Sequence, residues 1–99
     1  MIIEKTIDSL SKKYALSPED FIKHGSTLTL RERKRNLQIE RIEILARYEA
    51  ETVNDLEGKI KKGTAPEHPT WEALIEIKNI EAEIKEIEND ISTLQAAGG

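Results

Sequence analysis

Residues 73–94 read ALIEIKNIEAEIKEIENDISTL and carry the strongest pattern in the chain. Apolar side chains recur there in steps of four, three, four, three, four and three residues, at Ala73, Ile77, Ile80, Ile84, Ile87, Ile91 and Leu94. A 3.5-residue repeat is typical of a coiled-coil seam, in which one apolar stripe of a helix packs against a second helix. We therefore predict one long helix over about 70–95, roughly 39 Å long at 1.5 Å per residue.

Acidic side chains border this seam on both sides and bias what can pack on it. Glu76, Glu83 and Asp90 follow one border, and Glu81 and Glu88 follow the other. Two copies of the helix would therefore bring like charges together in either direction. Each such pair costs only a few tenths of a kcal/mol, against about 1.5–3 kcal/mol gained for each fully buried isoleucine. A mate with an apolar centre and basic edges is favoured, while a homodimer or higher oligomer stays open.

The same chain offers one such mate. Residues 30–48 are predicted to form a helix with Leu30, Leu37 and Ile44 on one side, and basic residues at Arg31, Arg33, Lys34, Arg35, Arg41 and Arg47. An antiparallel hairpin of this helix with residues 70–95 would place these basic residues against the acidic borders of the seam and neutralise both sets of charges. The other candidate is a separate basic protein. Ile39 and Ile42 project from the opposite side, a pattern typical of a central helix that is covered on two faces.

Turn and capping residues divide the N-terminal part of the chain. A first helix over about 2–15 has apolar residues at spacings of four, three and four. Ser17 can cap a second helix, because its hydroxyl can accept a backbone N–H bond in the first turn. Gly25 is predicted to end that helix. Thr29 and Glu32 have the spacing of a capping box, which predicts the start of the next one.

The C-terminal part is divided in the same way. Thr52 is predicted to cap a short helix that Gly63 ends, and Pro66 and Pro69 cannot lie inside a continuous helix. We therefore predict a single all-α domain over 1–99. Its parts are an N-terminal helical pair over 1–25, a central helix and a short helix over 29–63, a linker over 64–69 and the long helix over 70–95.

Composition excludes several classes of protein. Of the 99 residues, 34% are charged and 4% aromatic, and there is no cysteine, which excludes disulfide scaffolds and thiol catalysis and suits a reducing cytoplasm. No run approaches the roughly 20 apolar residues that cross a bilayer, so no membrane association is expected. Residues 1–35 hold eight Lys/Arg against five Asp/Glu, whereas residues 36–99 hold seven against fourteen. This asymmetry of +3 and −7 favours pairing with itself or with a basic partner.

Catalytic chemistry has no residue pattern to support it. His24 and His68 lie far apart, and neither has a second histidine at metal-ligand spacing. Glu67 and Glu72 near His68 come without a nucleophile or a glycine-rich phosphate loop. We expect no enzyme activity, no metal and no cofactor.

Two further features have alternative interpretations. The basic run Arg31, Arg33, Lys34 and Arg35 could contact nucleic-acid phosphates, or it could be a solvated helix start that pairs with the acidic last helix. Glu32 interrupts the run and no aromatic residue accompanies it, which favours the second interpretation. Trp71, in the first turn of the last helix, is expected to anchor the linker against the core; exposed, it would be a partner anchor.

Residues 47–75 carry a family resemblance. The order Arg47-Tyr48, Thr52-Val53-Asn54-Asp55-Leu56, Gly63 and Glu67-His68-Pro69-Thr70-Trp71-Glu72 resembles small helical antitoxins of prokaryotic type II toxin–antitoxin pairs, over perhaps residues 10–95. Where that family pattern leads us to expect Tyr-Gly at the end of the central helix, this chain has Tyr48-Glu49.

The resemblance implies an interaction protein whose acidic last helix covers a basic toxin and whose basic N-terminal half binds operator DNA. The expected partner contacts are Trp71, Glu76, Ile77, Ile80, Glu83, Ile84, Ile87, Ile91 and Leu94. The alternative is a homo-oligomeric coiled-coil scaffold or adaptor, because isoleucine at both seam positions favours trimers or tetramers.

Overall fold

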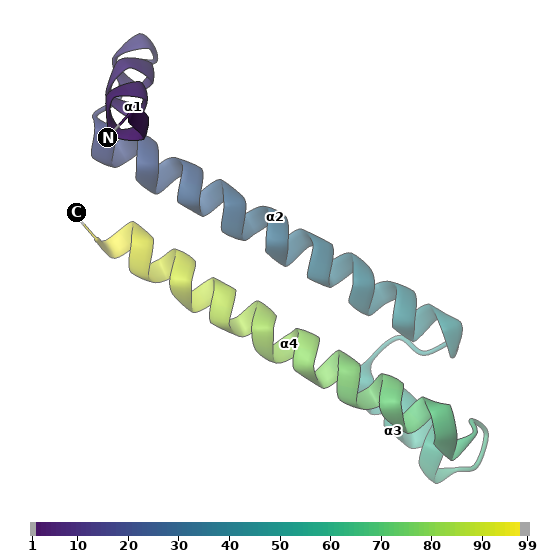
Figure 1. Ribbon diagram of the computed structural model, residues 1–99. Coiled ribbons are helices and arrows are strands. Elements are labelled where there is room, and N and C mark those ends of the chain that lie inside the picture. The colour runs from purple at the N-terminus through teal and green to yellow at the C-terminus, as the bar shows by residue number, and fades with distance from the viewer. Residues whose placement is uncertain (1, 98–99) are drawn as a thin grey trace.

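Residues 2–97, which the computed structural model describes, fold into four helices. They are α1 (Ile2–Lys13), α2 (Pro18–Arg47), α3 (Val53–Lys61) and α4 (Glu67–Ala96). No strand occurs in this part of the chain, so the predicted all-α class is confirmed. Figure 1 shows α2 and α4 side by side along the length of the molecule, with α3 beside α4 at one end and α1 at the other.

The two long helices form an antiparallel hairpin in a molecule of 60 × 24 × 21 Å. The register is marked by contacts from Arg41 to Glu81, from Arg33 to Glu83, and from Lys23 to the backbone of Gln95 and Ala97. Residue numbers fall along α2 as they rise along α4, as an antiparallel pair requires. The intrachain mate that the charges indicate is therefore the one that packs on the isoleucine seam.

The core lies at the end of the hairpin where α3 packs, which we call the closed end. Apolar side chains from three helices meet there. The fully buried ones include Ile44 of α2, Leu56 of α3, and Leu74 and Ile77 of α4. Burying such a side chain contributes roughly 1.5–3 kcal/mol, so this end supplies most of the hydrophobic stabilisation of the hairpin.

The opposite, open end is less well filled. The α2 residues that face α4 recur in steps of four and three, and all are buried or half-buried: Lys23, Thr27, Leu30, Lys34, Leu37, Arg41, Ile44 and Tyr48. Three of the first four are polar. Because these polar side chains cannot fill an apolar seam, Ile91 and Leu94 at the open end of α4 are only half-buried, whereas Ile77 and Ile80 are buried.

The predicted break after residue 25 is wrong, because α2 continues through Gly25 as one helix of 30 residues. The predicted N-terminal helical pair over 1–25 is therefore α1 and the first turns of α2. A glycine ends a helix by adopting a positive φ, and Gly25 does not have one. Thr29, predicted to cap a new helix, instead donates its hydroxyl to the carbonyl of Gly25 at 2.9 Å, a bond that a threonine makes inside a helix.

Other predicted boundaries are confirmed. The Ser17 hydroxyl accepts the backbone N–H of Asp20 at 3.0 Å, and the Thr52 hydroxyl accepts that of Asp55 at 3.0 Å. Gly63, with a φ of 73°, follows α3 in the left-handed conformation. Within α4 the backbone of His68 is non-helical, so the regular part of that helix begins at Pro69, the last residue of the predicted linker and one residue before the predicted helix start.

α2 ends without a glycine. Glu49 itself takes the left-handed conformation, with a φ of 53°, and its N–H donates to the carbonyl of Ala46 while that of Ala50 donates to Leu45. These two bonds are those of a Schellman motif. Glutamate thus stands where the family pattern leads us to expect a glycine. Because its Cβ is strained in the left-handed conformation, this costs roughly 1–2 kcal/mol.

Substituting alanine for three glycines tests these helix boundaries, because the free energy of unfolding should rise at some of the positions and fall at another. At Gly25 and Gly58 an added Cβ meets open space in a helix, whereas Gly63 has a positive φ. We expect Gly25→Ala and Gly58→Ala each to raise the free energy of unfolding by about 0.5–1 kcal/mol, and Gly63→Ala to lower it by about 1 kcal/mol or more. Urea unfolding followed by circular dichroism measures all three. Destabilisation by Gly25→Ala would contradict a continuous α2.

The strained end of α2 has its own test. Glu49→Gly removes the Cβ penalty and is expected to raise the free energy of unfolding by roughly 0.5–1 kcal/mol. Glu49→Ala, which keeps the Cβ, is the matched control and should show little change. Equal gains from both substitutions would mean that side-chain charge, not backbone strain, is responsible.

Candidate interaction surface

The isoleucine seam of α4 is occupied within the chain. Ile77, Ile80 and Ile87 are buried against the core, and Ile84, Ile91 and Leu94 are half-buried around it. These six side chains are among the predicted partner contacts, and within the chain the isoleucines among them belong to the core cluster or pack against it. The physical reason is tethering: a helix in the same chain is present at a high effective concentration. A separate partner could use this seam only by displacing α2.

The acidic borders of the seam are partly neutralised by basic residues of α2. Arg33 donates to both carboxylate oxygens of Glu83, at 2.8 and 3.3 Å, and Arg41 Nε donates to Glu81 at 2.8 Å. The hydrogen bond and the charge of Glu83 raise the pKa of Arg33. Glu83, one of the two predicted acidic partner contacts, thus already forms an ion pair within the chain. The other, Glu76, is exposed.

The basic run at residues 31–35 does not form one patch. Successive residues of a helix point about 100° apart, so neighbours in sequence face different directions. Arg33 binds Glu83, and Lys34 is half-buried on the side facing α4. Arg31 and Arg35 are exposed. The four residues therefore cannot present a common surface to a nucleic-acid backbone, and the pairing interpretation holds for Arg33.

Trp71 is 49% exposed, so its predicted place in the core is wrong. It lies one residue beyond the fully buried Thr70 and four residues before Ile75, which is 47% exposed. Residues four apart share a helix face, so Trp71 and Ile75 form an exposed apolar pair on the outside of α4. The second interpretation of Trp71, as a partner anchor, is compatible with this position.

α1 exposes most of the apolar face that its residue spacing predicts. Ile3 and Tyr14 are each 62% exposed, and Leu10 is exposed as well, whereas Ser11 is completely buried. Ser11 can be buried because its hydroxyl donates to the carbonyl of Asp8 at 2.9 Å. An open groove, which we call the α1 groove, separates α1 from α2 and is lined by Ile7, Phe21, Ile22, Gly25, Ser26, Thr29 and Leu30.

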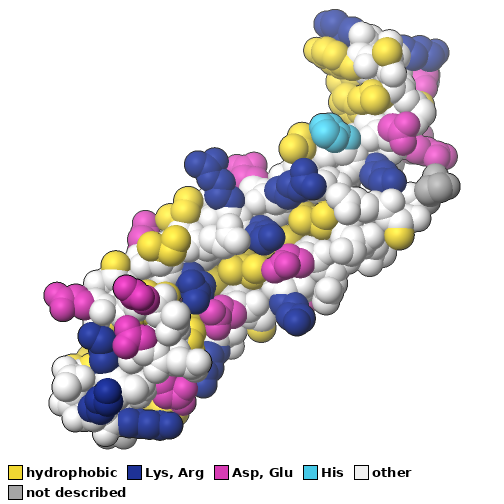
Figure 2. Space-filling view, turned by 180° about the vertical axis from the view of Figure 1, so that it is seen from behind, with side chains coloured by type: hydrophobic (Ala, Val, Ile, Leu, Met, Phe, Trp, Pro, Cys, Tyr) yellow, Lys and Arg dark blue, Asp and Glu magenta, His cyan; other side chains and the backbone are white. Residues whose placement is uncertain are grey.

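The α1 groove lies on the same side of the hairpin as an acidic flank of α4. Glu76, Glu83 and Asp90 are seven residues apart and share one face of α4. Glu83 binds Arg33, and Arg33 shares a face of α2 with Thr29, four residues before it. Because Thr29 lines the groove, an occupant of the groove would lie near this flank. Figure 2 shows, from one side, apolar side chains between the helices with charged side chains on their borders.

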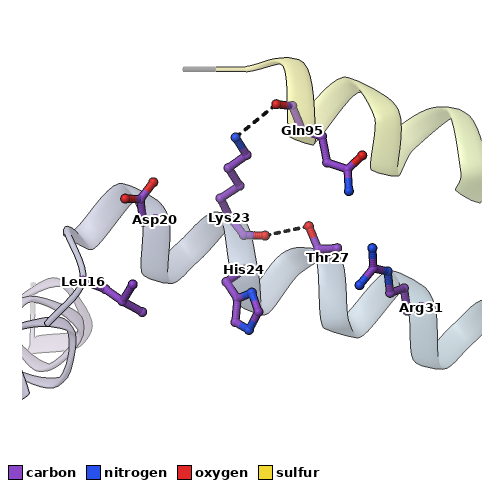
Figure 3. Close-up of a pocket in the computed structure, with 7 residues that line it drawn as sticks. All are labelled: Leu16, Asp20, Lys23, His24, Thr27, Arg31 and Gln95. Carbon is purple, nitrogen blue, oxygen red and sulfur yellow. Dashed lines mark hydrogen bonds between the residues drawn. The ribbon is translucent and has the colours of Figure 1, made fainter. Parts of the chain in front are cut away.

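A second pocket lies at the open end, where Lys23 joins the two long helices. Lys23 Nζ donates to the carbonyl of Gln95 at 3.2 Å (Figure 3). It also donates to the carbonyl of Ala97 at 3.1 Å. A cation at these carbonyls complements the negative end of the α4 dipole. The pocket is lined by Leu16, Asp20, Lys23, His24, Thr27, Arg31 and Gln95. The two hydrogen bonds of Lys23 hold the end of α4 against the start of α2.

The groupings of titratable side chains concern possible metal ligands and one histidine–carboxylate pair. Among the described residues no group of three or more His, Cys, Asp or Glu side chains could hold a metal ion. His68 lies 3.6 Å from Glu72, but both side chains are strongly exposed. None of the helices described in residues 2–97 is long and apolar enough to cross a membrane.

The chain belongs to the uncharacterized protein MJ0235 family, which it matches over residues 1–99. No curated protein and no solved structure matches it. The family assigns no activity, so the exposed surfaces are the basis for a functional hypothesis.

Two isoleucines on α4 distinguish the core from the surface. Ile77 is fully buried and Ile75 is 47% exposed, only two residues away. We expect Ile77→Ala to lower the free energy of unfolding by about 2–5 kcal/mol, the usual cost of emptying a core site, and Ile75→Ala to change it by roughly 0.5 kcal/mol. Chemical denaturation measures both variants. Equal effects would show that the seam is not packed within the chain.

Proposed function

We propose that the chain is a protein-binding module without chemistry of its own, and that it binds a basic partner along the exposed apolar face of α1, the α1 groove beside it and the acidic flank of α4. The observation that carries this proposal is the exposed apolar face of α1. A helix that buries a serine and exposes Ile3, Leu10 and Tyr14 is poorly explained by folding alone. Exposed apolar surface of this kind, bordered by polar residues, is typical of protein-interaction sites.

Charge supports the choice of a basic partner. Glu76 and Asp90 on the acidic flank are exposed, and neither makes an ion pair within residues 2–97. A partner helix with an apolar stripe and lysine or arginine at its edges could place the stripe in the groove and the basic edge against the flank. Such complementarity raises the association rate and rejects acidic competitors.

The finer form of the proposal is an antitoxin that covers a basic toxin in the cytoplasm. Its support is the sequence resemblance in residues 47–75. The contact surface differs from the one that the sequence indicates, because α2 occupies the isoleucine seam. The toxin would bind the α1 groove and the acidic flank, with Trp71 and Ile75 as a further possible anchor, and inhibition would come from covering its active surface.

A homo-oligomeric scaffold is the second candidate. It cannot use the seam of α4, which is filled. The observation in its favour is a row of exposed apolar residues on the outside of α2, including Leu28, Ile39 and Ile42.

Co-expression with the product of the adjacent gene tests the proposed function. We expect a stable complex that weakens as salt is raised, because screening reduces attraction between exposed charges. Replacing Ile3, Leu10 and Tyr14 together by serine should weaken the complex by at least tenfold, measured by titration calorimetry, without loss of helicity. If that product is a toxin, the complex should also relieve its growth inhibition.

The control is Lys78→Ser, an exposed change on α4 away from the groove. A chain that remains free beside the product would contradict the proposal. So would a complex that is unaffected by the α1 triple variant, which would place the contact elsewhere.

A further inference from the structure

α2 carries a second repeat on the side that faces away from α4. Residues in steps of four and three form an outer stripe: Phe21, Gly25, Leu28, Glu32, Arg35, Ile39, Ile42 and Ala46. This is the same 3.5-residue spacing as on the inner side, continued through all eight positions. A repeat sustained over three to four heptads is typical of a coiled coil.

Within residues 2–97, α1 reaches only the start of this stripe, where Phe21 and Gly25 line the α1 groove. The apolar residues of the stripe from Leu28 to Ile42 are exposed. Leu28 is 51% exposed, Ile39 44% and Ile42 61%. The edge of α2 that faces away from α4 is visible in Figure 2, where apolar side chains alternate with acidic and basic ones. The sequence predicts a central helix covered on two faces, yet α4 covers only one of them.

The two charged residues of the stripe determine what can cover it. Glu32 and Arg35 stand at its centre, three residues apart, on the same face and both exposed. A second copy aligned in parallel would set Glu32 against Glu32 and Arg35 against Arg35, and both pairs repel. An antiparallel copy, related by a two-fold axis between residues 33 and 34, would set Glu32 against the partner's Arg35 twice.

The apolar positions satisfy the same symmetry. Reversing the stripe about its centre matches Leu28 with the partner's Ile39, Gly25 with the partner's Ile42, and Phe21 with the partner's Ala46. Leu28 and Ile39 thus form an apolar pair next to the charged centre, and at the two outer levels a large side chain meets a small residue. Gly25 has open space at its Cβ position, which leaves room for an isoleucine beside it.

We propose that two copies of this chain associate antiparallel through the outer stripe of α2, with the Glu32–Arg35 pairs setting the register. The arrangement is an isologous two-fold interface, the commonest type in homo-oligomers. It gives the scaffold candidate a defined surface. The outer stripe shares Phe21 and Gly25 with the α1 groove. Glu32 and Arg35 do not line that groove, so changes at these two positions test the dimer separately from the binding of a basic partner.

The charged pair can be tested by reversal. Sedimentation velocity over a range of protein concentrations should show a dimer for the native chain. Glu32→Arg alone and Arg35→Glu alone should each weaken it by roughly tenfold or more, because each creates like-charge contacts. The double variant Glu32→Arg with Arg35→Glu should restore it. Both changed residues are on the exposed surface, and unchanged helicity and unfolding midpoints of the three variants as monomers would show that the fold is intact.

The direction can be tested by cross-linking, since the native chain has no cysteine. In the antiparallel dimer Leu28→Cys would lie roughly 16 Å from its own copy, eleven residues along the helix at 1.5 Å each, but beside Ile39→Cys of a second chain. A mixture of the two single variants should therefore form a disulfide-linked heterodimer, and Leu28→Cys alone should not. Asn89→Cys, on the exposed side of α4, is the control that should stay monomeric.

Two outcomes would overturn the proposal. One is a native chain that remains monomeric at every concentration up to roughly 1 mM, the weak limit of specific association. The other is rapid cross-linking of Leu28→Cys with itself, which would indicate a parallel pair. A failure of the charge-reversal pair to restore the dimer would show that Glu32 and Arg35 do not face each other.

Discussion

The packing of the α4 isoleucines on α2 is the contact on which the remaining structure depends. The molecule has two long helices and no third layer along most of its length, so this one interface must hold them. It buries Ile77 and Ile44 completely. α3 adds Leu56 to the closed end, and α1 attaches to the first turns of α2. Without the hairpin, neither short helix would have a surface to pack on.

The interface changes character along its length. Near α3 it resembles a small globular core, because Leu37, Ile44 and Leu45 meet apolar residues of two other helices. Toward the termini Thr27 and Lys34 face the seam, and charge replaces burial: Arg33 holds Glu83, and Lys23 holds the end of α4. Exposed ion pairs contribute little stability, but opposite charges at fixed positions select one register among the several that an isoleucine repeat allows.

The same chain leaves a large share of its apolar side chains in contact with solvent. They gather on α1, on the outside of α2 and at the start of α4, each bordered by charges. A protein of 99 residues has a small core. Its exposed apolar side chains contribute hydrophobic stabilisation only when a partner buries them. These exposed surfaces are the basis of the proposed interaction role, since the uncharacterized family to which the chain belongs assigns none.

The amino-acid sequence by itself determined most helix boundaries, because 3.5-residue spacing, Ser17, Thr52 and Gly63 act through local backbone and side-chain geometry. It did not determine that α2 continues through Gly25. The sequence also indicated α2 as one candidate to pack on α4, because the arginines of α2 are complementary in charge to the glutamates of α4. Only the tertiary structure decided which apolar faces are covered. Ile3, Ile42 and Trp71 have the spacing or size of core residues, yet each faces solvent, while Ser11 and Thr70 are buried. Periodicity shows that residues share a face; whether another helix reaches that face depends on the angle and length of every connection in the chain.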